Sequence, residues 1–307
     1  MTLPSGSSSS ARADRNGAVD LARFLGALGI VWFHESASFA WIGYAALPMF
    51  MAFVLYFSLF SAGRRTGRQD AFLRAKRLLV PWLAWCVIYG LAKVVDAMVK
   101  DAPLSSEFDT WMLLTGSKIH LWFLPFAFVA GLLIRQAVMS LHYSDRTFWA
   151  LNIGFVAIQL ASFWLLTSFV MERPLDQWLF VVPACYLGVM LCAADGKQLR
   201  LLAVCVAAAI AFAIASSLGW HHGVAQMVIA TIMCAAVLTI QIQASATTDF
   251  LSSIALGVYL IHPLIHAVLL RLVDLQPYTW AFALLVLALS IMAIAVMRRT
   301  PILRQII

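Results

Sequence analysis

Two ionisable side chains, Arg23 and His34, lie within one apolar stretch, residues 19–36. An ionised side chain at the centre of a membrane helix costs roughly 2.5–3.5 kcal/mol on insertion scales, so such residues usually serve a function. Eleven residues are just over three helical turns, which places Arg23 and His34 on nearly the same face and roughly 16 Å apart. Histidine is suited to general base catalysis and arginine to binding anions.

The residues around this pair extend the same pattern. Asp20 lies three residues before Arg23, where an ion pair along the helix would lower the cost of burial. Glu35 follows His34, but adjacent helical residues point about 100° apart. We therefore expect Glu35 to orient an acceptor molecule and not to hold His34. The alternative is that Arg23 and Asp20 anchor the helix at the membrane surface, while His34 is a hydrogen-bonded packing residue.

A second basic cluster, Arg74 to Arg77, precedes the third apolar stretch. Arg74 and Arg77 share a helical face, and two guanidinium groups one turn apart can bind phosphate oxygens in a bidentate manner. Pro81 is predicted to break this helix just inside the membrane. The alternative function of the cluster is an ordinary contact with lipid headgroups.

Further histidines are predicted near His34. His262 lies about 18 Å from the start of its helix, and Pro263 frees the carbonyl group of Tyr259. His120 begins the fourth apolar stretch, so three histidines from distant segments are predicted in the outer half of the protein. His262 and His266 have the spacing of zinc ligands, but no third ligand is evident, and we expect no metal.

The composition excludes a soluble globular protein. Of 307 residues, 63% are hydrophobic and 11% charged, with a mean hydropathy of +0.90, whereas soluble domains have about 25% charged residues. The polar, Ser-rich residues 1–16 are predicted to be a disordered cytoplasmic tail, and residues 17–307 a membrane domain. The five cysteines all lie in apolar runs and are predicted to be small core residues.

We therefore predict an all-α polytopic membrane protein, taking about 20 apolar residues per crossing. About ten spans are expected, near residues 18–38, 43–61, 78–97, 119–139, 147–168, 177–193, 199–218, 224–243, 250–271 and 279–297.

Basic residues indicate the orientation. With both termini in the cytoplasm, the cytoplasmic segments hold fifteen of the twenty-one Lys and Arg residues, as the positive-inside rule requires. They are Arg12, Arg15, Arg64, Arg65, Arg68, Arg74, Lys76, Arg77, Arg135, Arg146, Lys197, Arg200, Arg298, Arg299 and Arg304. Lys93, Lys100, Lys118, Arg173 and Arg271 fall outside. The net charge of +7 is explained by topology, and no nucleic-acid partner is expected.

These motifs together resemble the integral-membrane acyltransferase family 3. The resemblance rests on Arg23 and His34 with ten residues between them, on Arg74-Ala-Lys-Arg77, on "HLWFLP" and on the late "GVYLIHPLI". It extends over essentially the whole chain from Arg15 onward.

The resemblance implies about ten spans and O-acylation of polysaccharides or other envelope glycans, usually with acetyl-CoA as donor. It implies that Arg23 and His34 are essential and that Arg74 and Arg77 are the cytoplasmic pair. We expect acyl-CoA, a glycan acceptor and the lipid bilayer as partners, in the bacterial inner membrane. The further candidate site-lining residues are Asp20, Glu35, His120, Tyr259 and His262.

In the predicted mechanism, Arg74 and Arg77 bind the phosphates of cytoplasmic acyl-CoA, and His34 is the general base for a sugar hydroxyl. Arg23 is expected to contact the donor or the developing charge. The alternatives are a transporter or flippase for a lipid-linked glycan, or a membrane scaffold without catalysis. The acceptor, the length of the acyl group, the choice between direct transfer and an acyl-enzyme, and the oligomeric state stay open.

Overall fold

The structure is a computed structural model that describes residues 16–60, 67–138, 144–220, 222–273 and 276–307. Within these ranges the secondary structure is helical, apart from turns and one isolated bridge between Asn16 and Gln243. The predicted all-α class is confirmed.

The long helices coincide with the predicted spans. They are α2 (Gly17–His34), α4 (Ala46–Phe60), α5 (Gly67–Lys100), α7 (Phe123–Val138), α8 (Asp145–Ser168), α9 (Leu175–Ala194), α10 (Gln198–Ser217), α11 (His222–Thr239), α12 (Ala246–Leu272) and α13 (Trp280–Met297). In the described part of the chain, nine helical segments are long and apolar enough to cross a membrane, and the apolar helix Gly223–Thr239 is shorter. The protein is therefore a polytopic membrane protein.

Short helices connect or extend the long ones. They are α3 (Ala40–Gly43), η1 (Leu104–Ser106), α6 (Met112–Thr115), η2 (Ile119–Trp122) and η3 (Leu303–Gln305). Of these, η2 leads directly into α7 and carries His120. It therefore fixes where that histidine enters the bundle.

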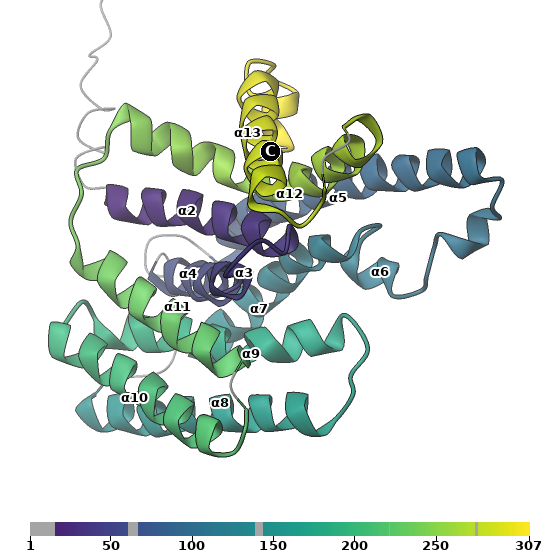
Figure 1. Ribbon diagram of the computed structural model, residues 1–307. Coiled ribbons are helices and arrows are strands. Elements are labelled where there is room, and N and C mark those ends of the chain that lie inside the picture. The colour runs from purple at the N-terminus through teal and green to yellow at the C-terminus, as the bar shows by residue number, and fades with distance from the viewer. Residues whose placement is uncertain (1–15, 61–66, 139–143, 221, 274–275) are drawn as a thin grey trace, which may run out of the picture.

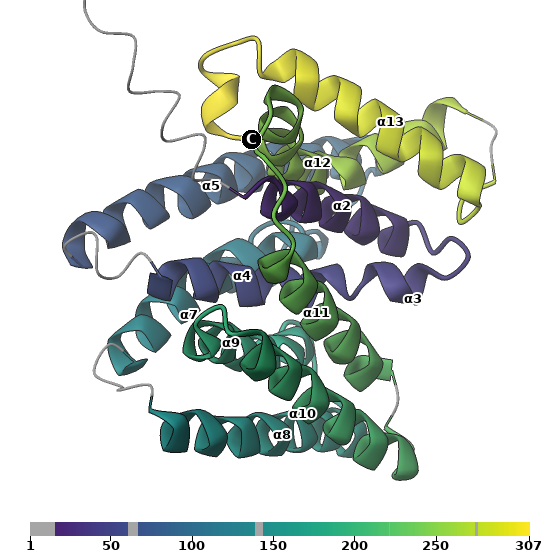
Figure 2. The ribbon, with the colours of Figure 1, turned by 90° about the vertical axis from the view of Figure 1, so that its left-hand side faces the viewer.

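The helices pack in layers around α4. Figures 1 and 2 show α8 and α10 as a lower layer, α9 and α11 above them, and α2, α12 and α13 on the far side of α4. The helix α4 contacts α2, α7, α9 and α11. Because α4 is surrounded by other helices, its apolar side chains form the centre of the core.

Only the last residue of the predicted tail, Asn16, lies within the described ranges. Residues 1–15 lie outside the described ranges. The side chain of Asn16 caps α2 by accepting a hydrogen bond from the Ala18 backbone, and it donates to the Ile240 carbonyl at 2.8 Å. The N-terminus of α2 is thus fixed to the segment between α11 and α12.

The predicted break at Pro81 is wrong. Pro81 lies inside α5, which runs without interruption from Gly67 to Lys100. A proline removes one backbone hydrogen bond, and membrane helices tolerate this where neighbouring groups compensate. The helix also begins eleven residues before the predicted span at residue 78, so Arg74 and Arg77 lie on regular helix.

Ion pairs join residues that were predicted on the same side of the membrane. Lys100 and Arg271, both predicted outside, bind Asp96 at 2.5 and 2.6 Å. Arg200, predicted inside, binds Asp145 at 2.5 Å in the loop predicted inside. These pairs support the predicted alternation of the spans. The two ends of the bundle are called the Arg74 end and the His34 end below.

A close backbone contact joins α2 to α3. A Cβ at Gly29 would lie 3.0 Å from the Gly43 carbonyl oxygen, and a Cβ at Gly43 would overlap the Gly29 carbonyl. Small residues allow membrane helices to approach in this way. The glycine in α2 therefore determines how closely the chain that follows His34 packs back on the helix.

We expect Gly43→Ala to lower the melting temperature of the detergent-solubilised protein. The new methyl group meets backbone, which yields less than a side chain, and overpacking typically costs about 1–3 kcal/mol. Gly90→Ala is the matched control, because nothing lies within 4 Å of a Cβ at Gly90. Equal melting temperatures for the two variants would contradict the contact.

Candidate active site

A cavity of about 520 Å³ extends from the Arg74 end into the bundle between α2, α4, α5, α7 and α12. We call it the first cavity. Three arginines, Arg23, Arg74 and Arg77, and one carboxylate, Asp70, line it. The sequence predicted that these arginines serve one ligand, and the structure brings them to one cavity from two helices.

The rest of the first cavity is mostly apolar and aromatic. The aromatic lining residues are Phe50, Phe53, Phe57, Phe60, Phe123 and Tyr259. Ile30 and Tyr259 lie seven residues beyond Arg23 and Ser252 on α2 and α12, which is about 10 Å along each helix. The far end of the cavity therefore lies about 6 Å, one helical turn, before His34. Charge is concentrated at one end of the cavity and apolar surface at the other.

Asp70 connects two arginines beside the cavity. Its Oδ2 accepts from Arg74 Nε at 2.5 Å and from Arg135 Nη1 on α7. The side chains of Asp70 and Arg135 are only 6% and 7% exposed, so the carboxylate of Asp70 compensates positive charge that is buried at Arg135. The two arginines of the predicted phosphate-binding pair therefore differ in environment. Arg74 binds Asp70, whereas Arg77 is exposed.

Arg23 packs against an aromatic ring at the same end. Its guanidinium carbon lies 5.4 Å from the centre of the Phe57 ring, within the range of a cation–π interaction. This contact orients Arg23 toward α4. Because three helical turns separate Arg23 from His34, the two residues act at opposite ends of α2.

Three histidines meet at the His34 end. The ring centre of His262 lies 5.1 Å from that of His34 and 5.7 Å from that of His120. His120 and His262 are 5% and 1% exposed, whereas His34 is exposed. The prediction that these residues come together in one half of the protein is confirmed, and His34 is the accessible member of the group.

The local backbone determines which nitrogen of His262 carries a proton. Pro263 cannot donate to the Tyr259 carbonyl, and the Nδ1 atom of His262 lies 2.7 Å from that oxygen. A carbonyl oxygen only accepts, so Nδ1 is the donor. In a neutral ring the Nε2 atom then has a lone pair, and it is buried without a hydrogen-bond partner among the described residues. The proline thus fixes the orientation of His262.

Two tyrosines hold the buried histidines in place. The hydroxyl group of Tyr259 donates to the His120 carbonyl, and that of Tyr89 donates to the Leu260 carbonyl at 2.7 Å. The Tyr89 and His120 rings meet edge to face at 5.2 Å. Because Tyr259 also lines the first cavity, a single side chain contacts both the cavity and the histidine group.

The carboxylate of Glu35 pairs with His266 of α12. Glu35 is 1% exposed, and its Oε2 lies 2.8 Å from Nδ1 of His266, one turn beyond His262 on α12. This pair joins the C-terminal end of α2 to α12. Asp20 is buried in the first turn of α2 and does not line the first cavity.

Two cations act on the His34 end. His34 experiences the positive charges of Arg173 and Lys118, which are exposed residues of the neighbouring loops. Partial desolvation, followed by repulsion from Lys93, lowers the pKa of the Lys118 amino group. The positive charges of Arg173 and Lys118 attract negative charge that develops beside His34.

Metal binding is not indicated by the described residues. No group of three or more His, Cys, Asp or Glu in those ranges has the geometry to hold a metal ion. The cysteines are free thiols, and Cys185 and Cys234 are buried in the helical core.

The sequence analysis did not predict three of the pairing partners in this site, Asp70, Arg135 and His266. Asp70 precedes Arg74 by four residues, a helical spacing that would have indicated the pair. Arg135 and His266 pair with residues 65 and 231 positions away. No local pattern identifies such partners, because they depend on how the helices pack.

A comparison with known families shows which family the chain belongs to. The family model of acyltransferase family 3, described as an acyltransferase domain, matches residues 16–297. The chain belongs to acyltransferase family 3. The matched range includes the first cavity and the histidine group, and the resemblance predicted from the motifs is confirmed. No curated protein and no solved structure gives a significant match. Membership of acyltransferase family 3 supports the activity of a membrane acyltransferase.

We expect Asp70→Asn to destabilise this acyltransferase. Removing one partner of a buried ion pair typically costs about 3–5 kcal/mol, and Asp70→Asn removes the carboxylate that binds the buried Arg135. Thermal unfolding of the purified protein measures the effect. Asp195→Asn is the control, since Asp195 is exposed in a left-handed conformation that asparagine tolerates. An unchanged melting temperature for Asp70→Asn would refute the role of the carboxylate.

Proposed function

We propose that the protein transfers an acyl group, of which acetyl is the expected case, from cytoplasmic acyl-CoA to a hydroxyl group of an envelope or exported glycan. The observation that carries the proposal is the alignment of the two parts of the site. The first cavity begins at three arginines and reaches Tyr259, whose ring centre lies 6.2 Å from that of His262. His262 in turn lies against His34.

The proposed orientation puts both termini and the Arg74 end in the cytoplasm of a bacterial inner membrane. It follows from the excess of Lys and Arg residues in the segments of that end. In this orientation the first cavity accepts a donor made inside the cell, and His34 faces the opposite side, where exported glycans are found.

The donor in this proposal lies along the first cavity. Acyl-CoA carries its negative charge at the nucleotide end, which suits Arg77 and Arg23. The uncharged arm and its thioester suit the aromatic walls that lead to Phe123 and Tyr259. Arg23 is then a donor-binding residue, because three turns of helix separate it from the reacting carbonyl group near His34.

His34 is the proposed general base. As the acceptor oxygen attacks the thioester carbonyl carbon, His34 takes the hydroxyl proton, a carbon–oxygen bond forms and the carbon–sulfur bond breaks. The proton then passes to the departing CoA thiolate, so no other reactant is consumed. The accessible position of His34 beside two buried histidines supports its assignment over His120 and His262.

Glu35 and His266 are proposed as positioning residues. Their hydrogen bond holds the last turn of α2 against α12, so it keeps the rings of His34 and His262 side by side. In this proposal Glu35 acts on the acceptor through the placement of His34.

We expect His34→Ala to abolish glycan acylation while CoA binding persists. The donor's phosphates bind at the opposite end of α2, so removal of the base affects chemistry and not donor affinity. Mass spectrometry of envelope and exported glycans compares cells that express the wild type, the variant or no protein. An acyl mass increment that depends on the wild type identifies the acceptor.

Two results would contradict this function. Retained acylation by His34→Ala would refute the base. If deletion of the gene stops export of the glycans but leaves them acylated, the result would favour a transporter or flippase.

We expect Arg77→Ala to raise the KM for acyl-CoA about tenfold with little change in kcat, since a hydrogen bond to a charged group is worth roughly 1.5–3 kcal/mol. Initial rates over a range of donor concentrations measure both constants. Arg68→Ala is the control, because Arg68 is exposed on the same helix and does not line the first cavity. An unchanged KM for Arg77→Ala would exclude the phosphate contact.

A further inference from the structure

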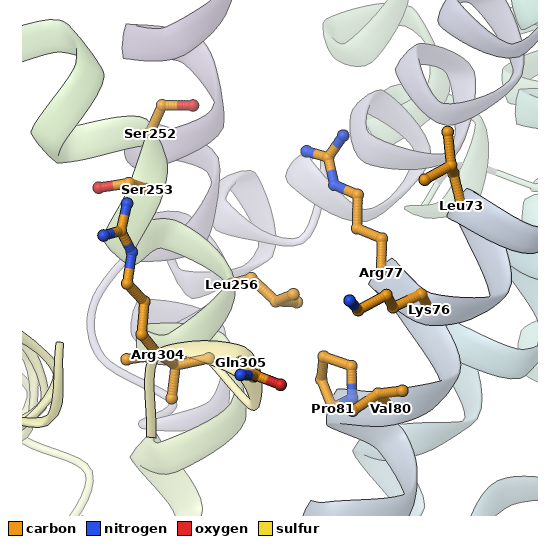
Figure 3. A pocket seen from close by; sticks show the side chains of 11 residues that line it. Leu73, Lys76, Arg77, Val80, Pro81, Ser252, Ser253, Leu256, Arg304 and Gln305 are labelled. Carbon is orange, nitrogen blue, oxygen red and sulfur yellow. The ribbon is translucent and has the colours of Figure 1, made fainter. Parts of the chain in front are cut away.

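A second cavity of about 340 Å³ lies beside the first at the Arg74 end. As Figure 3 shows, α5 forms one wall with Lys76 and Arg77, and the start of α12 and the segment after α13 form the other. Arg304 and Gln305 of this segment line the cavity opposite Lys76. Neither Lys76 nor Arg304 was assigned a role in the site by its sequence motif.

The segment after α13 is held in place against α5. The buried indole of Trp85 donates to the Ile306 carbonyl at 2.8 Å. The Arg304 backbone donates to the Thr300 carbonyl at 3.0 Å. These bonds at both ends of η3 fix the backbone that carries Arg304, so the second cavity has a defined wall.

The lining of the second cavity suits phosphate groups. Lys76, Arg77 and Arg304 supply three cations, Ser252 and Ser253 supply hydroxyl groups, and the described lining contains no Asp or Glu side chain. Arginine and lysine are the usual ligands of phosphate, which arginine binds in a bidentate manner.

The electrostatics around Arg304 also favour the binding of an anion in the second cavity. Partial burial and the positive charge of Arg304 lower the pKa of the Arg298 guanidinium group. Cations that repel one another in the structure gain free energy when an anion binds between or beside them.

The two cavities share their boundary. Leu73, Arg77, Ser252 and Leu256 line both. Figure 3 shows Arg77 and Lys76 extending from the same wall of α5, with Leu256 between that wall and Arg304. A ligand with an uncharged arm in the first cavity can therefore place a bulky anionic end in the second without leaving the protein.

We propose that the second cavity binds the phosphorylated nucleotide end of the acyl donor, with Lys76 and Arg304 as ligands of its phosphate groups. This inference rests on the proposed function and deepens it. It defines the donor class as thioesters that carry a phosphorylated nucleotide, and it makes the segment after α13 part of the donor site.

The competing source of phosphate is a membrane lipid. An anionic headgroup could satisfy the same cations at the surface of the bilayer. The continuity with the first cavity favours the nucleotide. The two sources are separated by measuring binding with and without anionic lipid.

The test measures affinity by calorimetry with the full-length protein in nanodiscs. The probes are CoA and 3′-dephospho-CoA, and the nanodiscs contain either phosphatidylcholine alone or a mixture with phosphatidylglycerol. The variants are Arg304→Gln and Lys76→Gln, with Arg299→Gln as the control, because Arg299 is exposed nearby and does not line the second cavity. Arg304→Lys tests whether a cation at this position restores binding, and melting temperatures show that each variant is folded.

We expect Arg304→Gln and Lys76→Gln each to weaken CoA binding about tenfold in phosphatidylcholine nanodiscs, with Arg299→Gln unchanged. Arg304→Lys should restore part of the affinity. A smaller loss for 3′-dephospho-CoA would assign the contact to the 3′-phosphate, and an equal loss would assign it to the diphosphate.

Two outcomes overturn the inference while leaving the proposed function intact. In the first, CoA affinity of the folded Arg304→Gln and Lys76→Gln variants stays within twofold of the wild type. In the second, the variants differ from the wild type only when phosphatidylglycerol is present, which assigns the cavity to lipid. Failure of the wild type itself to bind CoA would instead overturn the proposed function and this inference together.

Discussion

The packing of α2 against α12 determines the geometry of the whole site. Each of these two helices contributes residues both to the Arg74 end of the site and to its His34 end. The start of α2 is joined to the segment before α12 through Asn16 and through the Gly17 backbone, which donates to the Ile242 carbonyl at 2.8 Å. At the other end, Glu35 binds His266 at 2.8 Å. These contacts fix the relative height of the two helices, so the cavity walls and the histidine pair cannot shift independently.

The distribution of charge along this helix pair follows from its position in a membrane. The cations at the Arg74 end include the exposed Arg77 and the buried Arg135, whose charge is compensated by Asp70. Between the two ends, the first cavity is lined mainly by apolar aliphatic and aromatic side chains, so an uncharged ligand arm is favoured there over ions. Histidine side chains, whose imidazole rings are neutral when deprotonated, occupy the other end. This sequence of charged, apolar and titratable groups matches the parts of an acyl thioester and its acceptor.

Much of this arrangement is predictable from sequence, because helical periodicity and membrane thickness are strong constraints. Runs of about 20 apolar residues predicted the spans, and counting turns placed His34 and His262 at the same end. The continuation of α5 through Pro81 was not predictable, since it depends on the surrounding structure. The partners of Asp70 and Glu35 also depend on how each helix is rotated about its axis, and a single sequence does not specify that rotation. The wall formed by Arg304 is a further example, because a segment without periodicity gives no indication of where it folds.

The central claim is that one acyl group passes through the protein from the Arg74 end to the His34 end. The most direct measurement uses proteoliposomes with the protein in a single orientation, labelled acyl-CoA on one face and a glycan acceptor on the other. We predict labelled acceptor only when the donor faces the Arg74 end and the acceptor faces the His34 end. Labelling that requires both substrates on the same face would contradict transfer across the membrane.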